Sequence, residues 1–260
     1  MGLIEELARF RVIDAHAHNW SHFADTDYLR ACLDRFALRG IVMLSNLTGG
    51  FDPSPEEVSK SNEDTARLRD AVGERILPFC YVNAAHTEHA LAEVERWGDA
   101  GFCALKFWVS QRGTDERTCE VTEAALARGW PVLYHAYYRT HGEAPPNEAP
   151  PLDIAQLAER YPSGQFIMAH FGAQFEHGLR AIEHCPNVAV DYAGSINEKG
   201  AYEMALDLLG SERVLFGTDL PGADYFVNAG RVLELEVDDA VKQQVFSGNI
   251  ERILGLEVDG

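Results

Sequence analysis

Val12-Ile13-Asp14-Ala15-His16-Ala17-His18 is a segment near the amino terminus that leads from an apolar run into a pair of histidines. The run from Phe10 to Ala15 is too short for a helix and is typical of a buried strand. Because side chains alternate along a strand, we expect Asp14, His16 and His18 on one face and Ile13, Ala15 and Ala17 on the other. The segment predicts a strand whose carboxyl end carries two imidazoles.

Short apolar runs of the same kind recur along the chain, at Gly40–Ser45, Ile76–Val82, Phe102–Trp108, Trp130–Ala136, Gln165–Ala169, Val188–Tyr192 and Val214–Gly217. Segments with helical periodicity separate them. This alternation predicts a parallel sheet, and eight strand-helix units in 260 residues favour a closed (β/α)₈ TIM barrel over an open sheet. No linker or low-complexity tract interrupts the pattern, so we expect a single α/β domain over residues 1–260.

Several helix boundaries can be predicted from residues that favour helix ends. Ser54-Pro55-Glu56-Glu57 places a proline at the first helical position and acids in the first turn, which is typical of a helix start. Gly40 is the expected stop of the helix that Thr26 or Asp27 opens. A long helical tail is expected from Tyr225 to Leu254.

The composition narrows the classes of partner. Twenty-two basic and 41 acidic residues give a formal charge of −19, which repels nucleic acid and anionic membrane surfaces. The five cysteines are odd in number and form no CxxC pair, which favours a reducing compartment. No apolar run approaches the roughly 18 residues of a membrane span, and the first ten residues are unlike a signal peptide. We therefore expect a cytoplasmic protein with no nucleic-acid or membrane partner.

The longest connection, residues 137–151, follows the predicted fifth strand and contains four prolines. Long loops at the carboxyl ends of strands form substrate walls in barrel enzymes, but an inert insertion fits equally well.

Residues that can bind a metal follow four of the predicted strands. His16 and His18 end the first strand, and His135, His170 and Asp219 end the fifth, sixth and eighth. In a barrel these positions meet at one mouth. A core cannot easily bury four imidazoles and a carboxylate together without a cation, so the pattern predicts a divalent metal site.

Seven short motifs follow one another along the chain: Asp14–His18, Leu105-Lys106, His135, His170-Phe171-Gly172, Asn187–Asp191, Gly217–Pro221 and Gly248–Leu256. In combination they resemble the amidohydrolase superfamily, and within it the amidohydrolase-related family of metal-dependent hydrolases and decarboxylases. The resemblance covers nearly the whole chain. It implies a distorted barrel with a divalent ion, most often zinc, at the carboxyl mouth.

The resemblance also implies a role for each residue. His16, His18 and His135 would bind the metal together with the carboxylate of Asp219. Asp219 would also accept a proton from the water that the metal activates, as a general base. His170 would either bind the metal or stand beside it to polarise the substrate.

Lys106 ends the fourth predicted strand and leaves the number of ions open. Binuclear relatives carry a carboxylated lysine there, which would bridge two ions, with His135 and His170 on the second. As an ammonium, Lys106 would instead anchor a substrate anion or pair with an acid. One ion is expected, and two if Lys106 is carboxylated.

Weaker candidates surround these residues. Asp14 would either orient a ligand histidine or serve as a buried structural acid. Other residues could line the pocket or pair with a substrate, among them Trp20, His22, Asn46, Asn83, Trp108, Tyr137, Tyr138, Arg139 and His141. Four further histidines fall on predicted helices and are expected at the surface, namely His86, His89, His177 and His184.

Hydrolysis of a small-molecule amide, ester or lactone by metal-activated water is the main functional prediction. The alternative is non-oxidative decarboxylation of a small unsaturated or aromatic acid at the same metal. A metal-dependent deoxyribonuclease is disfavoured, because the central strands end without the glutamate of that pattern and no basic cluster is present to meet phosphates. A barrel that only stores metal is the remaining class. A homo-oligomer is compatible with the sequence, but nothing locates an interface.

Overall fold

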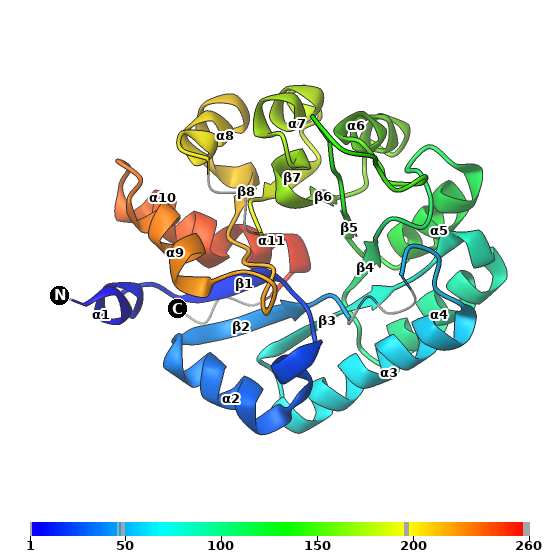
Figure 1. Cartoon of the computed structure of the whole chain (residues 1–260), viewed down its shortest axis with the longest axis horizontal. Helices are drawn as coiled ribbons and strands as arrows, with labels where there is room; N and C mark the ends of the chain where they lie inside the picture. The colour runs from blue at the N-terminus through cyan, green and yellow to red at the C-terminus, as the bar shows by residue number, and fades with distance from the viewer. Residues whose placement is uncertain (1, 46, 48–49, 195–197, 257–260) are drawn as a thin grey trace.

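The structure, a computed structural model, describes residues 2–45, 47, 50–194 and 198–256. Eight strands form one sheet in chain order, each parallel to the next (Figure 1). The strands are β1 (Val12–Ala17), β2 (Leu38–Met43), β3 (Ile76–Tyr81), β4 (Ala104–Phe107), β5 (Val132–Tyr134), β6 (Phe166–Met168), β7 (Val188–Asp191) and β8 (Val214–Leu215). They lie within one to two residues of the predicted runs.

Helices surround the strands on the outside, except the last one, whose residue Ile250 belongs to the apolar cluster inside the barrel (Figure 1). They are α1 (Leu3–Leu7), α2 (Thr26–Arg35), α3 (Pro55–Val72), α4 (Thr87–Asp99), α5 (Glu116–Ala127), α6 (Pro151–Arg160), α7 (Phe175–Ile182), α8 (Ala201–Leu209), α9 (Tyr225–Leu233), α10 (Asp239–Gln243) and α11 (Asn249–Leu254). None of the helices among the described residues is both long and apolar enough to cross a bilayer.

The sheet closes on itself between its first and last strands. The backbone N–H of Ala15 donates to the carbonyl of Phe216 at 2.9 Å, and that of His18 donates to Leu220 at 2.7 Å. Ala17 and Leu220 form a parallel bridge. These contacts make a nearly closed barrel and confirm the predicted (β/α)₈ fold, while a single domain over residues 1–260 stays a prediction.

Two apolar layers hold the barrel together. Its interior is filled by a cluster of mostly small and branched side chains: Ile13, Ala15, Val42, Leu44, Phe79, Ala104, Leu133, Ile167, Ala169, Ala189, Leu215 and Ile250. The alternate strand residues point outward and pack against the helices in a larger cluster. Because the interior is packed rather than hollow, the polar residues at the strand ends gather above this layer, at the mouth.

The strict alternation predicted for β1 is wrong after Ala15. Ile13 and Ala15 both belong to the interior cluster, yet His16 and His18 also reach the barrel mouth. The physical reason is an irregularity in the ladder, where Asp14 to Ala17 pairs with only Ile41 to Met43 of β2. An extra residue of this kind redirects the side chains that follow it, and such bulges are frequent beside active sites.

Three helix boundaries test the predicted capping. Ser54 caps α3 as predicted, and its hydroxyl accepts from the N–H of Glu57. The predicted stop at Gly40 is wrong, because Ala37 takes a left-handed backbone with φ 53° and Gly40 already lies in β2. The predicted long tail is interrupted between α9 and α10, and a turn of π-helix at Gln244–Gly248 precedes α11.

Candidate metal centre

Two histidines of the first strand and an aspartate after the last one meet at the barrel mouth. Nε2 of His18 lies 3.2 Å from Oδ1 of Asp219, and Nε2 of His16 lies 3.7 Å from the same oxygen. One ligand atom from each residue fits within 4.8 Å of the others. Both imidazoles are buried, whereas the side chain of Asp219 is 26% exposed and so faces the mouth.

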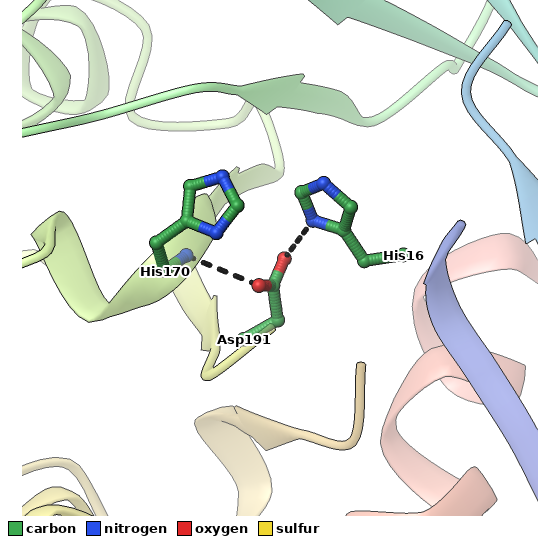
Figure 2. Close-up of side chains that lie close together, drawn as sticks. All are labelled: His16, His170 and Asp191. Carbon is green, nitrogen blue, oxygen red and sulfur yellow. Dashed lines mark hydrogen bonds and ion pairs between the residues drawn. The ribbon is translucent and has the colours of Figure 1, made fainter. Parts of the chain in front are cut away.

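Asp191, the last residue of β7, joins this group to the sixth strand. Figure 2 shows its carboxylate between His16 and His170. Oδ2 accepts from Nδ1 of His16 at 3.0 Å, and Oδ1 accepts from the backbone N–H of His170 at 3.1 Å. Asp191, His16 and His170 also satisfy the spacing of a metal site. Because both oxygens of Asp191 are already occupied, its clearest role is to hold the two histidines in place.

A second pair of imidazoles lies beside this group. Nδ1 of His135 is 3.1 Å from Nε2 of His170, whose ring centroid is 4.8 Å from that of His16. Nε2 of His135 contacts Oε1 of Glu148 at 3.3 Å. The structure therefore brings His135 next to His170, but it does not include His135 in either three-residue cluster of ligand spacing.

The partners of the four rings determine where their hydrogens lie. Carbonyl and carboxylate oxygens only accept hydrogen bonds. Nδ1 therefore carries the hydrogen in His16, which donates to Asp191, in His18, which donates to Ser45 O at 2.9 Å, and in His170, which donates to Ala193 O at 2.9 Å. In His135 the hydrogen sits on Nε2, because that atom faces Glu148. When the rings are neutral, the opposite nitrogen of each has a bare lone pair.

These bare lone pairs face other acceptors at short distance. Nδ1 of His135 faces Nε2 of His170, and Nε2 of His18 faces the carboxylate of Asp219. Nε2 of His16 is buried and has no hydrogen-bond partner among the described residues. Burial lowers the pKa of His16 well below its ordinary value and also lowers the pKa values of His135 and His170. Neutral rings in this arrangement repel one another unless a cation lies between them.

A divalent cation fits the spacing of these atoms. Two ligand atoms about 2.1 Å from one ion are separated by about 3.0 Å at a right angle and about 3.6 Å near 120°. Within the group of His16, His18 and Asp219 the observed separations of 3.2 and 3.7 Å fall in or close to that range. The 3.1 Å between His135 and His170, a pair outside that group, falls in it as well. Imidazole and carboxylate donors suit zinc and manganese alike. The chain therefore has a candidate site for a divalent metal.

The backbone at the site is strained in the way that functional sites often are. His170 and Asp219 take left-handed conformations with φ 60° and 68°, and Ser45, whose carbonyl holds His18, has φ 74°. Such residues cost about 1–3 kcal/mol each and persist only where the surroundings enforce them. All three follow strands at the carboxyl mouth, so the strain coincides with the candidate site.

Asp219 is an anion in this environment. Burial alone would raise its pKa, but when His18 donates a hydrogen to the carboxylate and His16 or His170 is protonated, these groups outweigh burial and lower the pKa far below its ordinary value. The site therefore contains one carboxylate that can bind a cation or accept a proton.

Lys106, in β4, supplies a positive charge next to the cluster. Its side chain is buried, and within the described parts of the chain no acid lies at ion-pair distance. Burial lowers the pKa of Lys106 to about 8, although the charges of Asp191 and Asp219 oppose that shift. The amine is thus mainly an ammonium at neutral pH and can receive an anion.

Some of the weaker candidate residues contact the metal-binding histidines, and others lie outside the site. Trp20 stacks on His18 with ring centroids 4.8 Å apart, and Tyr137 stacks on His135 at 5.7 Å. Asp14 accepts from the backbone N–H groups of His16 and Thr218, so it joins β1 to the segment after β8 and is a structural acid. Burial raises the pKa of Asp14 to about 7.

The remaining candidates contact other parts of the mouth or the surface. Asn83 holds the side chain of Asp52, and Trp108 packs against Phe51. Exposed positions are found for His22, Tyr138, His141, His177 and His184, whereas His86 and His89 are half-buried. Asn46 lies outside the described residues.

Two acids of the site are missed by the sequence analysis. Asp191 ends an apolar strand just as His135 and His170 follow theirs, so the same rule applied to every strand would have selected it. Glu148 lies in the proline-rich loop, where no spacing or period marks it. Its side chain is 2% exposed and binds both His135 and Arg139. Arg139, considered as a substrate anchor, instead donates from Nε and Nη2 to that glutamate at 2.6 and 2.8 Å.

Several solved structures are similar to nearly the whole chain. The 2,6-dihydroxybenzoate decarboxylase from Rhizobium aligns with a TM-score of 0.75 and 14% identity, over 96% of this chain and 100% of its own. The 5-carboxyvanillate decarboxylase from Sphingomonas paucimobilis aligns with a TM-score of 0.74 and 15% identity, over 95% and 100%. A dihydroxybenzoic acid decarboxylase from Polaromonas with bound manganese aligns with a TM-score of 0.74 and 15% identity, over 95% and 97%.

At these identities the solved structures show the fold alone, and no curated protein matches the chain. The family is shown by a different match. The model of the family described as amidohydrolase covers residues 13–256, which include the whole barrel sheet except Val12, the first residue of β1, and every residue of the candidate metal centre. The chain belongs to the amidohydrolase family.

Proposed function

We propose that the protein is a metal-dependent decarboxylase of a small aromatic or unsaturated carboxylic acid. The observation that carries this proposal is Lys106, a buried lysine without an ion-pair partner in the described chain, set beside the His and Asp cluster. Its ammonium form can hold the carboxylate of a substrate. The solved structures with a similar fold include decarboxylases of hydroxybenzoates, which supports the same chemistry.

In this proposal His16, His18, His135 and Asp219 hold one divalent ion, with His170 beside it. Manganese is bound in one of the similar decarboxylases, and zinc suits the same donors, so both metals are candidates. When bound, the ion acts as a Lewis acid that draws electron density from the oxygen atoms of the substrate.

The chain's own residues orient the substrate and move the proton. Lys106 binds the carboxylate, and Trp20, stacked on His18, offers a flat face to an unsaturated substrate. When the bond to the carboxylate carbon breaks, carbon dioxide leaves and the electron pair stays on the substrate carbon, which then needs a proton. Asp219 is placed to relay that proton from solvent through Oδ2, since Oδ1 faces the histidines and the side chain is partly exposed.

Hydrolysis of an amide, ester or lactone, the main prediction from the sequence, is the second candidate. The observation in its favour is the lowered pKa of Asp219, because an anionic carboxylate can accept a proton from an attacking water. The similar solved structures that carry an activity in their names support decarboxylation better than hydrolysis.

Product analysis separates the two. The protein, loaded with manganese or with zinc, is incubated in D₂O with hydroxybenzoates, other unsaturated acids, and matched amides, esters and lactones. The proposal predicts carbon dioxide and a product with one deuterium at the carbon that lost it. Water incorporation without carbon dioxide release would instead establish hydrolysis. Asp219→Asn is the control, and it should abolish either reaction.

The acidic surface supports a small-molecule substrate rather than a nucleic acid or membrane, given the formal charge of −19. A cytoplasmic location and a homo-oligomer stay predictions from the sequence.

A further inference from the structure

The proline-rich loop sends one buried acid to the candidate metal centre. Glu148 lies between α5 and α6 in sequence, and its side chain is 2% exposed. Oε1 lies 3.3 Å from Nε2 of His135. A loop that only covered the barrel mouth would have no need to bury a charged carboxylate there, because burial of an acid is costly unless it is paired.

Arg139 fixes Glu148 from the other side. Its guanidinium binds both carboxylate oxygens and lies over the ring of Tyr137 at 4.7 Å, and Tyr137 in turn stacks on His135. Backbone hydrogen bonds from Tyr137 to Ala149 O at 2.9 Å and from Tyr138 to Gly172 O at 2.8 Å tie the loop to the barrel. Arg139, Glu148 and His135 thus form a continuous chain of hydrogen bonds that ends at the site.

We infer that Glu148 is a positioning residue that keeps the hydrogen of His135 on Nε2 and leaves Nδ1 as the atom that faces the metal. The three other imidazoles are held in the opposite sense, with Nδ1 bonded to Asp191, Ser45 or Ala193 and Nε2 facing inward. The inference deepens the proposed function, on which the metal part of it rests.

The competing tautomer fails at the Nε2 end of the ring. A hydrogen on Nδ1 would donate to His170, but it would leave the lone pair of Nε2 opposite the carboxylate of Glu148. Arg139 holds that carboxylate in place with two hydrogen bonds, so the carboxylate cannot turn away. Residues that orient a ligand histidine in this way typically change metal affinity or activity by about 10–100-fold when replaced.

The first test measures the tautomer without metal or substrate. Long-range ¹H–¹⁵N spectra of the metal-free, unmodified protein at mildly alkaline pH report which nitrogen of each histidine carries the hydrogen. We expect His135 as the Nε2–H form, and His16, His18 and His170 as Nδ1–H forms. A hydrogen on Nδ1 of His135, alone or together with one on Nε2, would overturn the inference. Because this measurement needs no variant, a folding defect cannot obscure it.

The second test changes Glu148 and measures metal affinity by competition with a chelator. In Glu148→Gln either orientation of the amide sets an N–H against Arg139, and one orientation donates to Nε2 of His135. We expect part of His135 to shift to the Nδ1–H form and manganese or zinc affinity to fall about 10–100-fold. Glu143→Gln is the matched control, since Glu143 lies exposed on the same loop. It should leave the tautomer and the affinity unchanged.

The outcomes distinguish the inference from the proposed function. Unchanged affinity and tautomer in Glu148→Gln, with a thermal unfolding midpoint equal to that of the unmodified protein, would overturn the inference. A loss of affinity with an unchanged tautomer would also overturn it, because Glu148 would then act only through the shape of the loop. If the protein binds metal and His135 has the expected tautomer, but no acid loses carbon dioxide, the proposed reaction fails while the inference stands.

Discussion

The candidate site has two halves with similar ligand atoms, but the residues that hold those ligands in place differ between the halves. The β1–β8 half consists of His16, His18 and Asp219, and the β5–β6 half consists of His135 and His170. Each half sets two acceptor atoms against each other, at 3.2 Å in the first and 3.1 Å in the second. Both distances are short for two acceptors that face each other directly. Each half therefore requires a proton or a cation between its acceptor atoms.

The supports of the two halves come from different parts of the chain. The histidines of the β1–β8 half are held by a strand carboxylate, Asp191, and by the backbone carbonyl of Ser45. His135 of the β5–β6 half is held by Glu148, which belongs to a 15-residue connection outside the barrel strands. The comparison indicates that the barrel itself fixes one half, while the other also depends on a loop that can vary without changing the fold.

The largest effect is expected when the β1–β8 half loses its carboxylate. Asp219→Ala removes the acceptor that faces both His16 and His18. We predict turnover at background and metal affinity reduced by more than about 100-fold, which exceeds the usual effect of a residue that only orients a ligand. Metal content after dialysis and steady-state rates test this, with circular dichroism to show an intact barrel. Full metal occupancy in the variant would show that Asp219 is not a metal ligand.

Weakening the support of the same half should cost less. Asp191→Asn retains the shape of the side chain but weakens its hydrogen bond to His16 and allows the amide to turn. We predict a fall of about 10–100-fold in metal affinity, similar to that of Glu148→Gln in the other half. The ratio of the two losses, measured under the same conditions, compares the strand support with the loop support. No loss in Asp191→Asn would contradict the role given to this carboxylate.

Lys106 is expected to affect substrate binding rather than metal affinity, so its replacement tests a different step. Lys106→Met retains most of the buried stem and removes the charge. Hydrogen bonds to charged groups contribute about 1.5–3 kcal/mol, which corresponds to a fall of about 10–100-fold in kcat/KM. Metal content should remain that of the unmodified protein. If metal is lost together with activity, Lys106 takes part in holding the ion instead, as a carboxylated bridge would.

The smallest effect is expected at the ring that stacks on His135. Tyr137→Ala removes an aromatic contact but leaves the hydrogen bonds of Glu148 and Arg139. Aromatic pairs contribute about 0.5–1.5 kcal/mol, so metal affinity should fall by no more than about tenfold. Chelator competition measures it. A loss as large as that of Glu148→Gln would mean that stacking, and not the carboxylate, orients the β5–β6 half.

The sequence predicts the barrel well because its signals are local. Each strand is a short apolar run, and the carboxyl ends of parallel strands must lie at one mouth, so His16, His18 and Asp219 could be brought together before any coordinates. The bulge in β1 could not be predicted, since register depends on the neighbouring strand.

The supports of the site are harder to predict than its ligands. Glu148 is 13 residues from His135 in a loop without periodicity, and its burial depends on how four prolines and the pairing with Arg139 shape that loop. Asp191 also ends a strand, but the sequence places it only within the motif Asn187–Asp191 and does not show that its carboxylate holds two histidines. The choice between hydrolysis and decarboxylation depends on the substrate, which no local pattern encodes.

Anomalous X-ray diffraction from crystals of the protein grown with manganese or zinc tests the requirement for a cation most directly. Data collected on both sides of the metal's absorption edge locate the ion. We predict one anomalous peak within coordination distance of His16 Nε2, His18 Nε2 and Asp219 Oδ1, with Nδ1 of His135 turned toward it. A mouth with no peak, in which these atoms are joined by protons or water alone, would contradict the assignment of a metal centre.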